Sequence, residues 1–89
     1  MKVLAVIPAY NEAATVRDVA SRALGQIKDV IVVDDGSTDG TAAALAGLPV
    51  TLIRNPRNLG KAASLWRGIA VALAEDADAV VTLDGDGQH

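Results

Sequence analysis

The 89-residue sequence contains no cysteine, which excludes disulfide bonds and thiolate zinc sites. It also lacks any stretch near the ~20 apolar residues that a membrane-spanning helix needs. The apolar run at the start ends at Pro8 and polar residues follow, so a buried strand is a better interpretation than a signal peptide. These absences favour a cytoplasmic location, and any attachment to the cytoplasmic face of a membrane would have to lie outside this chain.

Basic residues are outnumbered, with 8 Lys and Arg against 11 Asp and Glu, for a net charge of -3. A nucleic-acid binder needs surplus basic groups to neutralise phosphates, so we expect no nucleic-acid partner. A small phosphorylated ligand needs only a few local donors and stays compatible with this charge. Since 51% of the residues are hydrophobic, the chain is globular, but one this short buries only about 60–65% of the surface that it exposes when unfolded.

Short apolar segments alternate with helical patterns along the chain. Four runs rich in Val, Ile and Leu, at residues 3–7, 30–33, 50–53 and 79–83, are typical of strands buried on both faces of a parallel sheet. Apolar residues at helical spacing predict helices at residues 16–27, 41–46 and 61–74, the last with Leu65, Ile69 and Leu73 on its apolar face. Asn11 or Thr15 could cap the first helix, and Ser37 or Thr38 the second.

This alternation predicts an α/β fold with a Rossmann-like, doubly wound parallel sheet. The strand order is 3-2-1-4 if the chain reverses direction after the third strand. Ligands of such sheets bind beyond the carboxyl ends of the strands. In this sequence polar, acidic and glycine-rich segments follow all four strands, at residues 8–12, 34–40, 54–61 and 84–89. Turns alone would not explain four carboxylates in two clusters, so a shared ligand site is the better interpretation.

Asp84 and Asp86 are spaced so that both carboxylates can converge on one divalent cation, Mg²⁺ or Mn²⁺. Such an ion would bridge a diphosphate and neutralise the charge that develops on a departing nucleotide. The alternative is a solvated acidic turn, for which Asp-Gly-Asp-Gly is well suited. His89 could add a third ligand, although a lone terminal histidine more often has no such role.

Asp34 and Asp35 form the second acidic cluster. A carboxylate at a strand end can accept a hydrogen bond from the ring N–H of uracil or guanine, or it can instead hold the following turn. Tyr10 could stack on the base or fill the space above the first strand. Glu12 could bind a ribose hydroxyl, or it could simply favour the positive end of the first helix.

Gly60 and Lys61 begin the third helix, where they could contact phosphate. They do not form a Walker loop, because Asn55 and Ala62 stand where that loop needs Gly and Ser or Thr. The first strand is not followed by G-x-G-x-x-G, which disfavours an NAD-binding domain.

Four ordered motifs resemble those of family-2 glycosyltransferases of the GT-A type, closest to the dolichyl-phosphate mannose synthase-like and polyprenyl-phosphate enzymes. They are Pro-Ala-Tyr-Asn-Glu at 8–12, Val-Val-Asp-Asp-Gly-Ser-Thr-Asp-Gly-Thr at 32–41, Asn-Leu-Gly-Lys at 58–61 and Leu-Asp-Gly-Asp-Gly-Gln-His at 83–89. The chain departs from the family at Ala62 and Trp66, where Gly and a basic residue are common, although Arg67 lies alongside.

The resemblance implies a nucleoside pocket, a metal site and a reaction. The reaction is the inverting transfer of a sugar from a nucleotide diphosphate, UDP or GDP, to an acceptor such as a glycan or a polyprenyl phosphate. The D-x-D pair would hold the metal, with Asp86 the more direct ligand. The implied donor-binding residues are Pro8, Tyr10, Glu12, Asp35, Lys61 and Asp84.

The resemblance also implies that residues 1–89 are the donor-binding half of the enzyme, with the acceptor site and catalytic base beyond His89. We therefore expect the chain alone to be inactive and to self-associate through the exposed edge strand at 79–83. One alternative is a nucleotide-binding module without catalysis. A less favoured alternative is a phosphatase of the haloacid dehalogenase type, whose D-x-D-G-T motif would need Thr in place of Gln88.

Overall fold

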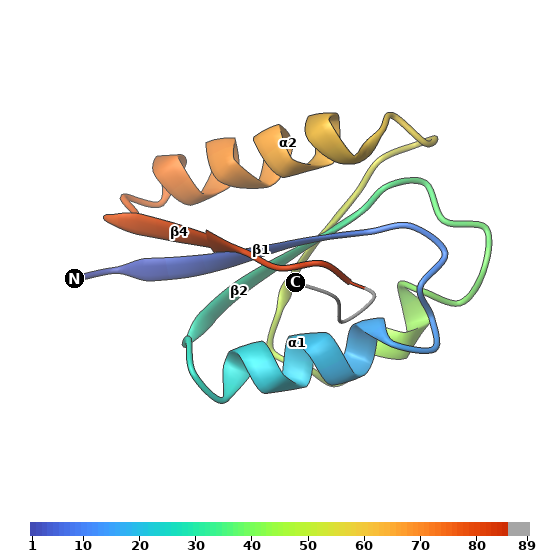
Figure 1. Cartoon of the computed structure of the whole chain (residues 1–89), viewed down its shortest axis with the longest axis horizontal. Helices are drawn as coiled ribbons and strands as arrows, with labels where there is room; N and C mark the ends of the chain where they lie inside the picture. The colour runs from blue at the N-terminus through green and yellow to red at the C-terminus, as the bar shows by residue number, and fades with distance from the viewer. Residues whose placement is uncertain (86–89) are drawn as a thin grey trace.

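The computed structural model of the chain describes residues 1–85, which form a parallel sheet of four strands flanked by helices (Figure 1). The strand order is β3-β2-β1-β4, and every neighbouring pair is parallel. This confirms the predicted fold class and strand order. In chain order the elements are β1 (Val3–Ala9), α1 (Val16–Leu24), β2 (Asp29–Asp34), the 3₁₀ turn η1 (Ala43–Leu45), β3 (Thr51–Arg54), α2 (Lys61–Ala74) and β4 (Ala79–Thr82).

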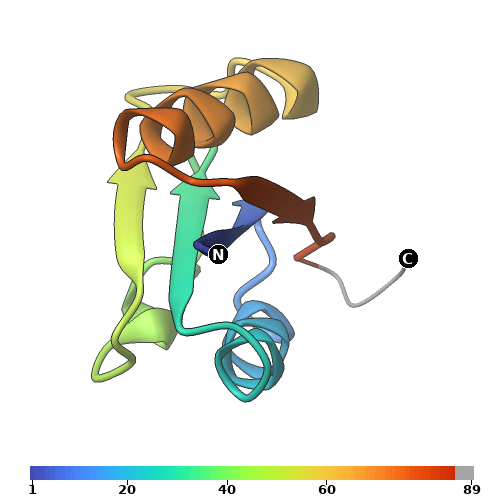
Figure 2. The ribbon, with the colours of Figure 1, turned by 90° about the vertical axis from the view of Figure 1, so that its left-hand side faces the viewer.

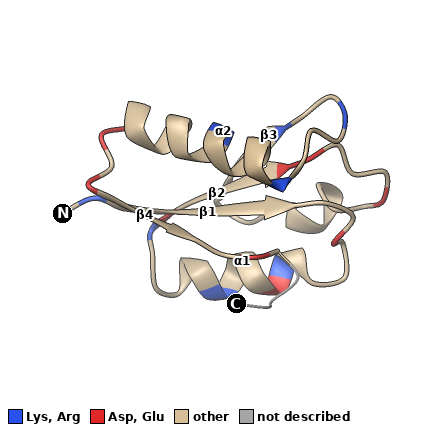
Figure 3. Cartoon of the chain, turned by 45° about the horizontal axis from the view of Figure 1, so that its top comes forward, with Lys and Arg blue, Asp and Glu red and all other residues tan. Residues whose placement is uncertain are grey.

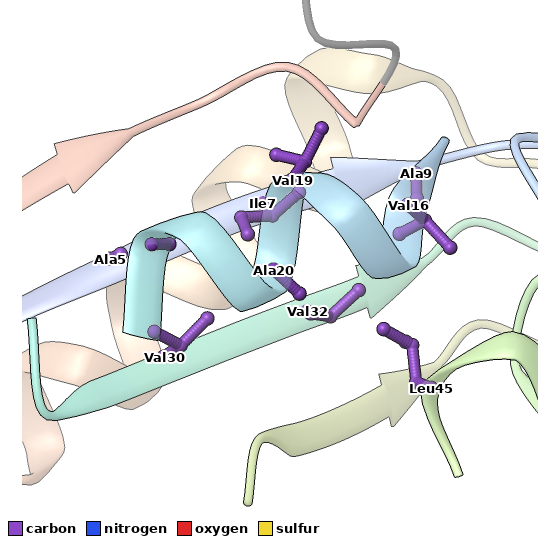
Figure 4. Close-up of a cluster of buried hydrophobic side chains, with 10 residues drawn as sticks. Ala5, Ile7, Ala9, Val16, Val19, Ala20, Val30, Val32 and Leu45 are labelled. Atoms are coloured by element: carbon purple, nitrogen blue, oxygen red, sulfur yellow. The ribbon is translucent and has the colours of Figure 1, made fainter. Parts of the chain in front are cut away.

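Helices cover both faces of the sheet. α2 lies on one face, and α1 and η1 lie on the other, as the two perpendicular views show (Figures 1 and 2). Successive residues of β1 point to opposite faces, so Ile7 packs in the layer under α1 while Leu4 and Val6 pack in the layer under α2. Figure 4 shows the first of these layers, in which side chains of β1, β2 and α1 interlock with Leu45. The central strands are therefore buried on both faces, as their continuous apolar sequences predict.

The predicted helix at 41–46 is wrong, because only the three residues of η1 are helical there. Leu45 is buried in the core, and Ala44 packs against the same cluster while remaining partly exposed. A helix this short gains too few hydrogen bonds to offset the cost of its first turn. The backbone leaves the helical region at Ala46, with ψ 133°, and Gly47 follows at φ 86°, so the turn ends at a glycine that can adopt a positive φ. Ser37 and Thr38 do not cap it, since both contact Asn11 instead.

The buried face of α2 also differs from the predicted one. Leu73 is 60% exposed and Leu65 and Ile69 are only half-buried, whereas Ser64, Gly68 and Ala72 face the sheet. A Cβ atom on Gly68 would lie 2.4 Å from Cγ1 of Val6, so the helix backbone rests almost directly on β1. Small residues permit this close approach, and the larger apolar residues are displaced to the flanks of the contact.

α1 is shorter than the predicted helix and lacks a side-chain cap. Thr15 occupies the N-cap position, but its hydroxyl donates to the carbonyl of Gly85 at 2.8 Å and caps no helical N–H. Ile27 lies beyond the end of the helix and still packs against the core. Neither helix in residues 1–85 combines the length and the apolar character needed to cross a membrane.

Candidate functional site

A pocket of about 320 Å³ opens at the carboxyl ends of the strands. All six predicted donor-binding residues line it, although they come from the four separate segments that follow the four strands. Ala9, Asn58, Gly60 and Gly85 complete its wall. The full set of predicted residues brought together is Pro8, Tyr10, Glu12, Asp35, Lys61 and Asp84.

The segment after β1 contributes an aromatic ring and a carboxylate to the pocket. Tyr10 is 44% exposed, so its ring is accessible rather than packed in the core. Oε1 of Glu12 accepts the backbone N–H of Tyr10 at 3.1 Å, and the carbonyl of Glu12 accepts two N–H groups at the start of α1. Glu12 therefore fixes the turn that presents Tyr10.

Asn11 joins this turn to the loop after β2. Its backbone has a positive φ of 50°, which asparagine tolerates better than most residues. The Asn11 N–H donates to Oγ of Ser37 at 2.9 Å, and its Oδ1 accepts the N–H of Thr38 at 2.8 Å and that of Asp39 at 3.3 Å. These bonds hold the two loops side by side.

Asp39 and Thr41 make further hydrogen bonds between the same two loops. Asp39 accepts the Ala13 N–H at 3.2 Å and the Thr41 N–H at 2.9 Å, and it also accepts the Thr41 hydroxyl. The buried Thr41 hydroxyl in turn accepts the Glu12 N–H at 2.9 Å. Hydrogen bonding from the Thr41 side chain is the main reason that the pKa of Asp39 lies below its usual value. Together these hydrogen bonds join residues 10–13 to residues 37–41. We call this contact the loop clasp, and it fixes one wall of the pocket.

Asp34 and Asp35 have different surroundings. Asp34 is fully buried, with Oδ1 accepting the Ser37 N–H at 3.0 Å and Oδ2 lying 3.4 Å from Nε of Arg54. Of the two interpretations left open, Asp34 thus has the turn-holding role. Asp35 is the one that lines the pocket.

The carboxylate of Asp35 is 3% exposed at the residue level and has three donors. Oδ1 accepts the Asn55 side-chain amide at 2.9 Å and the Leu59 N–H at 2.7 Å, and Oδ2 accepts the Gly60 N–H at 2.9 Å. Burial alone would raise the pKa of Asp35, but hydrogen bonds from Leu59, Asn55, Gly60 and the Ser64 side chain outweigh it and lower the pKa. Asp35 is therefore a stable anion beneath the pocket. The Gly60 N–H, considered above as a phosphate donor, is directed to Asp35.

Lys61 and Asp84 meet across the pocket as an ion pair. Figure 3 shows basic and acidic positions lying together at the start of α2. Asp84 is one third exposed and already accepts a cationic partner, so its hard oxygen atoms suit Mg²⁺ or Mn²⁺. Within residues 1–85 no cluster of three or more His, Cys, Asp or Glu residues could hold a metal ion. Asp86 and His89, the other predicted ligands, lie outside the described residues.

Three contributors to the site were not predicted from the sequence. Asn58 lines the pocket, and Asn55 and Ser64 are buried polar residues beneath it. Asn58 belongs to the Asn-Leu-Gly-Lys motif, which pointed to this segment. Asn55 and Ser64 have no such signal, because their role arises only when β3 and α2 meet at Asp35.

The family model for glycosyl transferase family 2 matches residues 4–89. The chain belongs to this family. Its strand order and the pocket at the strand ends agree with the GT-A type of fold, which its sequence motifs resemble.

Two curated relatives transfer sugars in the context of lipid phosphates, according to their names. The chain is 38% identical to the undecaprenyl-phosphate 4-deoxy-4-formamido-L-arabinose transferase of Aeromonas hydrophila, over 94% of this chain and 28% of the relative. It is 33% identical to the dolichol-phosphate mannosyltransferase of Pyrococcus furiosus, over 100% of this chain and 27% of the relative. The chain thus spans less than a third of the length of these two relatives.

A solved structure with bound ligands is also similar. Glucosyl-3-phosphoglycerate synthase from Mycobacterium tuberculosis, in complex with Mn²⁺, UDP and glucosyl-3-phosphoglycerate, superimposes with a TM-score of 0.76 at 30% identity. The match covers 94% of this chain and 33% of the synthase.

Proposed function

We propose that residues 1–89 form the donor-binding half of a glycosyltransferase domain. It binds a UDP- or GDP-linked sugar together with Mg²⁺ or Mn²⁺, and the enzyme transfers the sugar with inversion to an acceptor. The observation that carries the proposal is the convergence of Pro8, Tyr10, Glu12, Asp35, Lys61 and Asp84 on one pocket.

The nucleoside end of the donor fits the side of the pocket formed after β1 and β2. The accessible Tyr10 ring offers a stacking surface for the base. Asp35 is an anion that lines the pocket, and its carboxylate would accept a ring N–H of uracil or guanine beside the protein donors that hold it. Glu12 lines the same pocket, where its carboxylate would bind a ribose hydroxyl.

The diphosphate end fits the side of the pocket formed by Lys61 and Asp84. The Lys61 ammonium attracts phosphate, while Asp84, with Asp86, would hold the divalent cation. The cation would neutralise the charge of the departing nucleotide. Support for a divalent metal comes from the similar synthase, whose structure contains Mn²⁺ and UDP. When phosphate takes up Lys61, the Asp84 carboxylate is released for the metal.

The acceptor is proposed to be a polyprenyl phosphate, with a glycan as the other candidate. The names of the relatives from Aeromonas hydrophila and Pyrococcus furiosus support the lipid phosphate. A lipid acceptor would place the enzyme at the cytoplasmic face of a membrane. We assign no catalytic base to residues 1–85.

Titration calorimetry with Mn²⁺ tests this proposal. We expect UDP or GDP to bind at least tenfold more tightly than CDP and ADP, because only uracil and guanine present a ring N–H to Asp35. Equal binding of all four nucleotides would rule out base recognition by Asp35, and failure to bind any would refute the donor site. Selective binding without sugar transfer by the whole protein would favour the non-catalytic module.

A further inference from the structure

A buried amide connects α2 to the base-reading carboxylate. Asn55, which directly follows β3, is 4% exposed. Its Nδ2 donates to Oδ1 of Asp35 at 2.9 Å and to Oγ of Ser64 at 3.0 Å. On the other side, Arg67 donates to Oδ1 of Asn55 and, at 3.4 Å, to the carbonyl of Arg54. The NH₂ end of the amide therefore faces two acceptors, on Asp35 and Ser64, and its oxygen faces the cationic donor Arg67.

The orientation of the Asn55 amide depends on Arg67. The two ends of an amide have nearly the same shape, so only their hydrogen-bond partners decide which end points where. The guanidinium can only donate, and hence it requires the oxygen of Asn55. This leaves both amide hydrogens for Asp35 and Ser64. If the amide turned over, its oxygen would face the Asp35 anion.

Asn55 is also one of the donors that hold the Asp35 carboxylate in place. Three donors hold the carboxylate, and two of them are backbone N–H groups of Leu59 and Gly60, directly before Lys61. Without the Asn55 donor, these two backbone N–H groups of the loop that begins α2 would be left to hold the carboxylate, and its orientation towards the pocket would change. Close packing limits other arrangements, because a Cβ atom on Gly36 would lie 2.3 Å from the backbone of Arg57.

We propose that Asn55 and Arg67 are positioning residues that set base selectivity. Arg67 orients Asn55, and Asn55 orients Asp35 so that one acceptor position faces the pocket. The proposal rests on the proposed nucleotide-sugar site and deepens it. It also gives Arg67 a role beneath the base rather than at the phosphates.

The test compares Arg67→Met and Asn55→Leu with the matched control Arg22→Met. Arg22 is exposed on α1 and, within residues 1–85, forms an ion pair with Asp18, so its replacement removes the same charge away from the pocket. Binding of UDP against CDP, and of GDP against ADP, is measured by calorimetry with Mn²⁺. We expect the selectivity of the wild-type protein, about tenfold or more, to fall to about twofold or less in both variants and to persist in the control.

The ratio of affinities distinguishes a positioning role of these residues from a general loosening of the pocket. A loosened pocket would weaken the binding of all nucleotides together and would preserve the ratio. Arg67→Lys keeps a donor and should recover part of the selectivity. Because Arg67 is exposed, its variants should fold, and they decide the outcome if Asn55→Leu does not. An unchanged ratio in Arg67→Met would overturn this inference alone, whereas a wild-type protein that binds no nucleotide would overturn the proposed function with it.

Discussion

Asp34, Asp35 and Asp39 lie close together in the sequence, but their carboxylates have different partners. Asp34 is buried against Arg54, Asp35 accepts three donors beneath the pocket, and Asp39 bridges two loops. The sequence placed carboxylates at this strand end and left open which one held the turn. The roles of the three aspartates are distinguished only by their contacts with residues far along the chain, and the neighbouring sequence does not reveal those contacts.

The Asp39 clasp predicts a pH-dependent contribution to stability. The pKa of Asp39 is below the ordinary value of 3.8, mainly because of the Thr41 side chain, so its ionised form favours the folded state. This contribution is complete above about pH 5 and is lost as the pH falls below 3.8 towards the lower, folded-state pKa. Urea unfolding of the wild type and Asp39→Asn should give curves that differ at pH 7 and converge near pH 3. A difference that stays constant over this range would contradict the prediction.

Substitutions at Asp84 and Asp86 should affect nucleotide binding differently from a substitution at Glu12. Asp84→Asn and Asp86→Asn should abolish Mn²⁺-dependent nucleotide binding, because each removes a hard anionic oxygen. Glu12→Gln should weaken nucleotide binding with or without metal. Electron paramagnetic resonance of Mn²⁺, with the exposed Asp18→Asn as the control, measures the difference. An Mn²⁺ spectrum unaffected by Asp86→Asn would count against its role as a ligand.

At the level of elements, continuous β-branched runs predicted the four strands, and the doubly wound arrangement predicted their order. Burial on both faces holds only for the central strands β1 and β2, because β3 and β4 form the partly exposed edges of the sheet. Helix faces were harder to predict. The apolar residues of α2 indicated a face through Leu73, yet Ser64, Gly68 and Ala72 make the contact. Hydrophobicity alone gives no sign that a glycine is needed for backbone approach.

Gly68→Val should therefore destabilise the fold. The new side chain would overlap Val6, which is itself fully buried and cannot move aside, so we expect a loss of about 1–3 kcal/mol. Ala70→Val, on the exposed side of the same helix, changes helix propensity without this clash and should cost only about 0.7 kcal/mol. Chemical denaturation compares the two. Equal losses would mean that α2 can shift away from β1.

For the molecule as a whole, the two edges of the sheet differ. β3 ends at Arg54, which pairs with Asp34, and Pro56 follows shortly after. β4 has no charged residue or proline within its span. An apolar groove of about 330 Å³ lies beside it, lined by Val19, Arg22, Ala23, Gln26, Ile27, Val81 and Leu83. Edges of this kind, without charge or proline, are prone to pair with another chain.

We therefore predict that the 89-residue chain self-associates through β4, which Val81→Lys should suppress. Val81 is 40% exposed beside the groove, and burying a large aliphatic side chain is worth about 1.5–3 kcal/mol, which a lysine ammonium would oppose. Leu52→Lys on β3 is the matched control, since Leu52 is 38% exposed on the opposite edge. Sedimentation velocity should show association of the wild type and of Leu52→Lys, and a monomer for Val81→Lys. A wild-type chain that sediments as a clean monomer would show that β4 resists pairing without any charge on its edge.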